Sequence, residues 1–275
     1  MTTELRRRWK PLALLAGLAL SAGSLAAHDL FIKLDSYFLP KNTAVRVPVL
    51  NGTFSKSENS IARDRIAALT LSGPAGSSAL DTAALTARND TSFINLRTGD
   101  EGTYVLGLST RPRELALTGE QFNGYLKEEG LDDVLAERTR SGTLAEPAKE
   151  RYAKHVKAVF QVGATRSDAW ERPLGYPAEI IPLVNPYALR RGGTLQIRCL
   201  LEGQPGAELT VLAGGRTRTG GRLPQLRVRT DAEGRASIPL ATAGKWYVKF
   251  IRMQRSSEPG ITHESQWATL TFEVR

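Results

Sequence analysis

Short stretches of alternating apolar and polar residues dominate the pattern along the chain. Most are five to eight residues long and end at glycine, proline, asparagine or aspartate, which is typical of β-strands separated by turns. In the first half the predicted strands are 30–34, 45–49, 66–71, 91–96 and 102–109. In the second half they are 179–184, 195–201, 208–213, 226–230, 236–240, 246–253 and 267–274. The pattern predicts a mainly β fold with two antiparallel β-sandwich domains, the second Ig-like.

Between these halves the apolar residues take a helix-like spacing, beginning after Arg113. The stretch 118–126 opens with a capping residue and predicts a helix, 132–140 predicts a second, and a third opens at Pro147. Residues 157–162 return to a strand pattern. A helical segment is therefore expected between the two β domains.

The first 27 residues have the organisation of a secretory signal peptide. Residues 6–10 are basic apart from Trp9, 12–20 are apolar but too short to span a bilayer, and 24–27 supply the small residues Ser24, Ala26 and Ala27 for cleavage. Cleavage after Ala26 and cleavage after Ala27 both fit this pattern. Only the second makes His28 the first residue and gives it a free α-amine. We expect a periplasmic protein.

The predicted organisation follows from these three observations. It comprises a signal peptide (1–27), an N-terminal β-sandwich-like domain (28–113), a helical segment with a connecting strand (114–178) and a C-terminal Ig-like β-sandwich domain (179–275). A chain of 275 residues is long enough for two domains.

The charge of the chain indicates no nucleic-acid partner. The formal net charge is +9, and residues 1–27 hold four basic residues and one acidic residue, which leaves +6 on the remainder. The one basic cluster is Arg216, Arg218, Arg222, Arg227 and Arg229. No aromatic residues interleave with it, so a solvated hairpin is the better interpretation.

The sequence also carries little that indicates catalysis. It has no Gly-x-Ser-x-Gly elbow, phosphate-binding loop or His-Glu-x-x-His helix. The adjacent carboxylate pairs 128–129 and 132–133 point to different sides of a helix, which does not suit paired acid–base chemistry. Cys199 is the only cysteine, which excludes an intrachain disulfide, and its apolar neighbours predict a buried thiol. We expect the protein not to be an enzyme.

Eight stretches, in order along the chain, carry a resemblance to a known family. They are 27–31 (AHDLF), 102–109 (GTYVLGLS), 122–131 (FNGYLKEEGL), 150–158 (ERYAKHVKA), 179–187 (EIIPLVNPY), 230–236 (TDAEGRA), 246–251 (WYVKFI) and 264–273 (ESQWATLTFE). Together they resemble the DUF4198 family. The resemblance implies a periplasmic component associated with nickel or cobalt uptake, with a membrane metal transporter as partner.

The same resemblance indicates candidate metal ligands. The family's His-Asp pair after the leader corresponds to His28 and Asp29. Family members carry a histidine after the Phe-Ile of the late strand, where this chain has Arg252, a positive charge that would disfavour a cation. His263 and Glu264, just before the last strand, are the expected substitutes. His155, on the third predicted helix, is expected to be solvated.

Two functions of different classes follow. In the first, His28, Asp29, His263 and Glu264 bind a divalent transition metal: nickel, cobalt or copper, all of which accept nitrogen and oxygen donors. In the second, the protein is a non-metal binding module of the cell envelope that recognises a peptide, glycan or membrane partner through residues 53–64 and 114–156. The metal content of protein purified from the periplasm discriminates the two.

Overall fold

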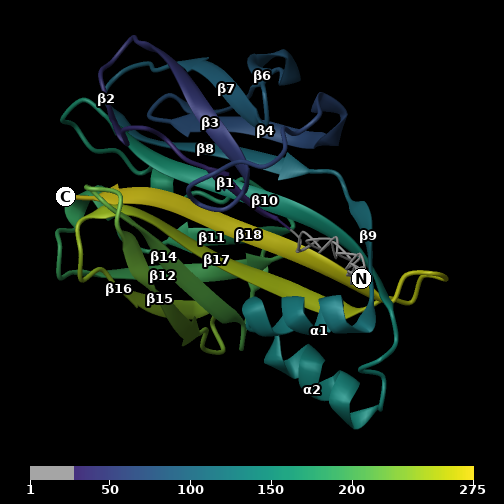
Figure 1. The fold of residues 1–275 in the computed structure, drawn as a ribbon. Coiled ribbons are helices and arrows are strands. Elements are labelled where there is room, and N and C mark those ends of the chain that lie inside the picture. Colours follow the sequence, from purple (N-terminus) through teal and green to yellow (C-terminus); the bar gives the residue numbers. More distant parts are fainter. Residues whose placement is uncertain (1–27) are drawn as a thin grey trace, which may run out of the picture.

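A computed structural model describes residues 28–275 of the chain (Figure 1). The signal peptide predicted for residues 1–27 lies outside the described residues. The predicted mainly β fold, in which most strand pairs are antiparallel, is confirmed. Among the described residues, neither of the two α-helices is long and apolar enough to cross a membrane.

The elements follow the chain in this order. They are β1 (Asp29–Ile32), β2 (Phe38–Leu39), β3 (Ala44–Gly52), β4 (Ile66–Gly73), β5 (Gly76–Ala79), β6 (Leu85–Arg88), β7 (Thr91–Arg97), β8 (Gly102–Thr110), β9 (Arg113–Leu117), α1 (Gly119–Glu128), α2 (Asp132–Arg140), β10 (Ala148–Val162), β11 (Ala178–Pro182), β12 (Thr194–Leu201), β13 (Gln204–Pro205), β14 (Thr210–Thr217), β15 (Arg222–Arg229), β16 (Arg235–Pro239), β17 (Gly244–Arg255) and β18 (His263–Val274). Single turns of 3-10 helix cover Arg63–Arg65, Thr82–Ala84, Ala169–Glu171 and Pro186–Ala188.

A large central sheet unites strands from both halves of the chain. Its main order is β15-β14-β17-β18-β10-β8-β4-β5, with β2 and β9 also paired to β10. The two longest neighbours, β10 and β18, run parallel, from the pair Glu150 and His263 to the pair Ala158 and Thr271. This parallel pair joins β8 and β4 of the first half to β17 and β14 of the second, as Figure 1 shows.

Two smaller sheets complete the sandwich. One has the order β1-β3-β7-β6, and the other joins β11, β12, β13 and β16. One hydrophobic cluster contains buried residues of both small sheets, such as Val47 and Ile197, together with Phe160 and Val248 of the central sheet. Burial of these apolar faces is the main force holding the layers together.

The two helices lie together on one end of the central sheet. The side chain of Thr118 accepts a hydrogen bond from the backbone N–H of Gln121 while Gln121 bonds back to Thr118, which forms the predicted cap of α1. Phe122 and Leu126 are fully buried and pack with Trp267 of β18 in a second apolar cluster. The helices predicted over 118–126 and 132–140 are confirmed.

The third predicted helix, opening at Pro147, is wrong, because these residues form β10. All residues from Ala153 to Val162 are buried, so the strand is covered on both faces. A strand of that kind loses the alternation that identifies strands in a sequence. Its charged and polar residues further obscured the pattern, since Lys154, His155 and Lys157 are all buried.

Candidate functional site

The described chain begins beside a loop that follows β3. β1 pairs antiparallel with the end of β3, with Asp29 opposite Gly52. The hydroxyl of Ser57 accepts a hydrogen bond from the N–H of Asn51 (3.0 Å) and donates one to the carbonyl of Asp90 (2.7 Å). These bonds hold the loop 53–58 against the end of β3, the strand that pairs with β1.

His28 and Glu58 face each other across this junction. The Nδ1 atom of His28 lies 3.2 Å from Oε2 of Glu58, and the side chains are 32% and 40% exposed. Both line a cavity of about 420 Å³, as do Phe31, Phe54 and Tyr247, whose rings pack against one another. An imidazole and a carboxylate are therefore accessible together at one cavity.

A buried ion cluster forms another part of the cavity wall. Lys249 of β17 places its Nζ atom 2.6 Å from Oδ2 of Asp29 and 2.7 Å from Oε2 of Glu129, the residue after α1. The Lys249 and Glu129 side chains are only 7% and 9% exposed. Burial opposes the charge of Lys249, but Asp29 and Glu129 outweigh it and raise the pKa of that amine above its ordinary value. Burial and the nearby Asp29 raise the pKa of Glu129 to about 7.

A second pair of buried charges lies next to this cluster. Nζ of Lys154 donates to the backbone carbonyl of His28 and lies 4.6 Å from the ring centre of Trp267. Burial lowers the pKa of Lys154 to about 8. Glu150, on the same strand, accepts a hydrogen bond from the hydroxyl of Tyr125 (3.1 Å), and burial raises its pKa. The start of β1 is thus held by charges from β10 and β17.

The structure separates the predicted metal ligands. His28 and Asp29 line the cavity, but His263 and Glu264 do not. His263 is 1% exposed, its Nδ1 lies 2.9 Å from the hydroxyl of Thr262, and its ring packs on Phe122. Burial, with Arg255 and Arg138, lowers the pKa of His263 to about 4.

Glu264 follows His263 on β18, so its side chain points to the opposite face of the strand. Its Oε1 accepts a hydrogen bond from the hydroxyl of Ser256 (2.9 Å). Within residues 28–275, no three or more His, Cys, Asp or Glu side chains are grouped to hold a metal ion.

Two other expectations are corrected. His155, expected on a solvated helical face, is buried on β10, with Nδ1 2.9 Å from the Ser109 hydroxyl and Nε2 2.8 Å from Oε1 of Gln266. Arg252 does not line the cavity. Arg252 lies three residues beyond Lys249 on β17, so its side chain is on the opposite face of the strand. Lys249 is therefore the basic residue of β17 that lines the cavity.

Glu58, Glu129 and Lys249 are the residues of this site that the sequence interpretation missed. A lysine inside the apolar stretch 246–251 was a usable signal, since a buried charge normally has a partner of opposite charge. Glu58 lies in the polar loop 53–64 that was proposed as a recognition surface for a different ligand class. Glu129 belongs to a carboxylate pair that was set aside as unsuited to catalysis.

The chain was compared with known proteins. The model of the family described as "Domain of unknown function (DUF4198)" matches residues 25–254. A search of curated proteins gave no significant match.

Three of the similar solved structures have titles that name an adhesion protein, a membrane anchored protein and a biofilm associated protein. The tetra-tandem repeat in the extending region of a large adhesion protein is 11% identical, with a TM-score of 0.23, and the match covers 90% of this chain and 49% of that one. A putative membrane anchored protein from Corynebacterium diphtheriae is 9% identical (TM-score 0.19, 88% and 53% covered). The BSP domain of a biofilm associated protein is 11% identical (TM-score 0.16, 85% and 28% covered). The chain thus spans about half of the first two chains, and scores this low carry no inference about function.

Proposed function

We propose that this chain, which belongs to the DUF4198 family, is an exported periplasmic protein. In this proposal it binds a divalent transition metal ion at His28. Glu58 is the second side-chain ligand in this proposal. The ion is the cargo of the protein, which acts as an accessory of nickel, cobalt or copper uptake or handling. The observation that carries the proposal is the approach of His28 Nδ1 to Glu58 Oε2, at 3.2 Å, on the wall of an open cavity.

The donor chemistry of His28 suits such an ion. After cleavage behind Ala27, the α-amine and the Nδ1 atom of His28 would close a six-membered chelate ring around one metal ion. Nδ1 is also the ring atom that faces Glu58. Two nitrogen donors and one carboxylate oxygen form a set that late first-row metals accept, with coordination positions left for water or a second ligand.

The ligand set differs from the one predicted from the sequence. Asp29 is held by Lys249 at 2.6 Å, so its Oδ2 is already engaged. His263 and Glu264 contact other parts of the fold. Above about pH 7, where Glu129 is ionised, the charges of the cavity wall tolerate a cation, because the carboxylates of Asp29, Glu58, Glu128 and Glu129 then outnumber the cations of Lys249, Arg216 and Arg222.

The test compares protein that begins at His28 with protein that begins at Ala27. Calorimetry with nickel, cobalt and copper should detect micromolar binding to the first form, with weaker binding to the second because its α-amine belongs to Ala27 and can reach the metal only if the amide nitrogen of His28 is deprotonated. Binding should weaken as the pH falls, since protons compete for both nitrogens. Glu58→Gln should lower the affinity about tenfold or more.

Glu128→Gln is the matched control, because Glu128 lines the same cavity without contacting His28. Binding that survives His28→Ala, or that is equal in the two forms, would place the metal elsewhere. If no metal binds at micromolar concentration, the metal function fails. A binding module of the cell envelope for a non-metal ligand then takes its place.

A further inference from the structure

The register of the central sheet aligns three basic side chains on neighbouring strands. Arg222 of β15 lies opposite Arg216 of β14, and Arg216 lies opposite Lys245 of β17. Lys245 in turn lies opposite Glu273 of β18. Directly opposed residues of antiparallel strands share one face, and like charges in such pairs are destabilising. The row therefore contains two successive repulsive pairs.

Close contact between the backbones of β14 and β17 fixes this row. A Cβ atom added at Gly215 would collide with the backbone carbonyl of Lys245, and one added at Gly244 would collide with that of Arg216. Only glycine fits at these two positions. Arg216 and Lys245 are consequently held opposite each other by the backbone itself.

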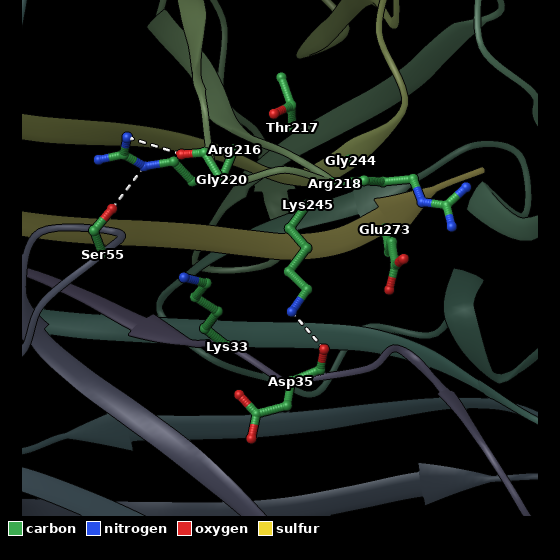
Figure 2. Close-up of a pocket in the computed structure, with 10 residues that line it drawn as sticks. All are labelled: Lys33, Asp35, Ser55, Arg216, Thr217, Arg218, Gly220, Gly244, Lys245 and Glu273. Carbon is green, nitrogen blue, oxygen red and sulfur yellow. Dashed lines mark hydrogen bonds between the residues drawn. The ribbon is translucent and has the colours of Figure 1, made fainter.

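A fourth cation faces the row from the segment after β1. Figure 2 shows Lys33, Arg216 and Lys245 around a pocket of about 590 Å³. Nζ of Lys33 donates to the carbonyl of Phe54 (2.8 Å). Burial lowers the pKa of Lys33, and the charges of Lys245 and Arg216 lower it further. The three cations are therefore close enough to affect one another.

No carboxylate forms an ion pair with these cations. Within residues 28–275, Lys33, Arg216, Arg222 and Lys245 have no Asp or Glu oxygen within 4.0 Å. Arg216 donates through Nε to the hydroxyl of Ser55 (2.7 Å), and Lys245 donates to the backbone carbonyl of Asp35.

The two acidic residues of the pocket form no ion pair with the row, although Glu273 lies opposite Lys245. Figure 2 shows the carboxylate of Asp35 directed away from Lys245. Oε2 of Glu273 accepts a hydrogen bond from the backbone N–H of Tyr37 (3.2 Å).

Two other arginines of the cluster, Arg227 and Arg229, behave differently from Arg216 and Arg222. Arg227 pairs with Asp132, and Arg229 lies 3.6 Å from Asp133 and 3.4 Å from Glu208. These two arginines attach α2 and a neighbouring turn to the hairpin. The unpaired charge is thus confined to the end of the hairpin that borders the pocket.

We propose that this pocket binds a small polyvalent oxyanion, whose negative groups are carboxylates or phosphates. The ligand would contact Arg216, Lys245 and Lys33 and relieve the repulsion between them. The hydroxyl of Ser55, also on the pocket wall, is a further donor. This proposal does not rest on metal binding at His28.

The test is calorimetry in low-salt buffer with two probes, citrate for the carboxylate class and inorganic pyrophosphate for the phosphate class. Preference for one probe identifies the class, and binding of either supports the site. Arg216→Gln and, separately, Lys33→Gln should each weaken binding about tenfold, as expected for loss of a charge-assisted hydrogen bond. Added salt should weaken binding as well.

Arg235→Gln is the matched control, because Arg235 is an exposed arginine of β16 that does not line the pocket. It should change the affinity less than twofold, a threshold of roughly 0.4 kcal/mol. The melting temperature of each ligand-free variant checks that the fold is retained. Failure of both probes at millimolar concentration would overturn the proposal. Affinity equal in wild type, Arg216→Gln and Lys33→Gln would overturn it too.

Discussion

The carboxyl group of Glu129 makes a sharp prediction about stability and pH. Its pKa is raised from 4.5 to about 7 by burial and by the charge of Asp29, despite the contact with Lys249. The folded protein therefore keeps a proton that the unfolded chain releases between these values. The stability that this group contributes is complete below about pH 4.5 and is lost as the pH rises through about 7. At about 1.4 kcal/mol per pH unit, the loss is about 3 kcal/mol.

Glu129→Gln removes this titration while keeping the shape of the side chain. Relative to wild type, the variant should gain about 3 kcal/mol of unfolding free energy between pH 4.5 and pH 8. Urea unfolding followed by tryptophan fluorescence measures this difference. With a slope of about 3 kcal/mol per molar urea, the two midpoints should move by about 1 M relative to each other.

Glu128→Gln is the control, since Glu128 is the last residue of α1, directly before Glu129, and is exposed. The unfolding free energy of the Glu128→Gln variant should equal that of wild type at every pH. Parallel curves for wild type and Glu129→Gln would refute the reasoning. They would mean that Lys249 keeps Glu129 ionised throughout and outweighs both burial and Asp29.

Three further predictions concern the same end of the molecule. Lys249→Met should lower the unfolding free energy at neutral pH by about 3–5 kcal/mol in urea titrations, because the carboxylate of Asp29 is left buried without its cation; an unchanged midpoint would contradict this. Phe122→Ala should lower the unfolding free energy by about 3–5 kcal/mol, since the ring is fully buried, and should speed proteolysis between residues 118 and 141. Equal cleavage rates in wild type and variant would show that contacts other than those of Phe122 hold the helices in place. His263→Gln should remove a dependence of the unfolding free energy on pH that has the opposite sign to the one removed by Glu129→Gln. Because the pKa of His263 is lowered, this residue contributes stability above pH 6.5 that is lost as the pH falls towards 4. Thermal unfolding scans of wild type and variant at these two pH values would detect the difference.

The sequence by itself determined the elements that depend on local interactions. The cap of α1 needs only Thr118 and Gln121, three residues apart, and the sequence predicted a helix that opens with a capping residue in this stretch. Strands such as β16 and β12 alternate between buried and exposed residues because one face is covered, so their pattern survives in the sequence. Cys199 lies in such an alternation and is buried as predicted.

The tertiary structure decided which distant residues meet. β10 looked helical because both of its faces are covered, which erases the period of two. His28 was identified from the sequence, but its neighbour Glu58 follows from the pairing of β1 with β3. The register of β18 places His263 opposite Glu150 and Arg255, away from the cavity that His28 lines.

The row of Arg222, Arg216 and Lys245 is likewise decided by the tertiary structure. It exists only because three antiparallel strands pair in one register, which a shift of one residue would destroy. The turn of the β14–β15 hairpin sets Arg222 opposite Arg216 locally, but the pairing of Arg216 with Lys245 joins strands that are not consecutive in the chain, and no local pattern encodes it.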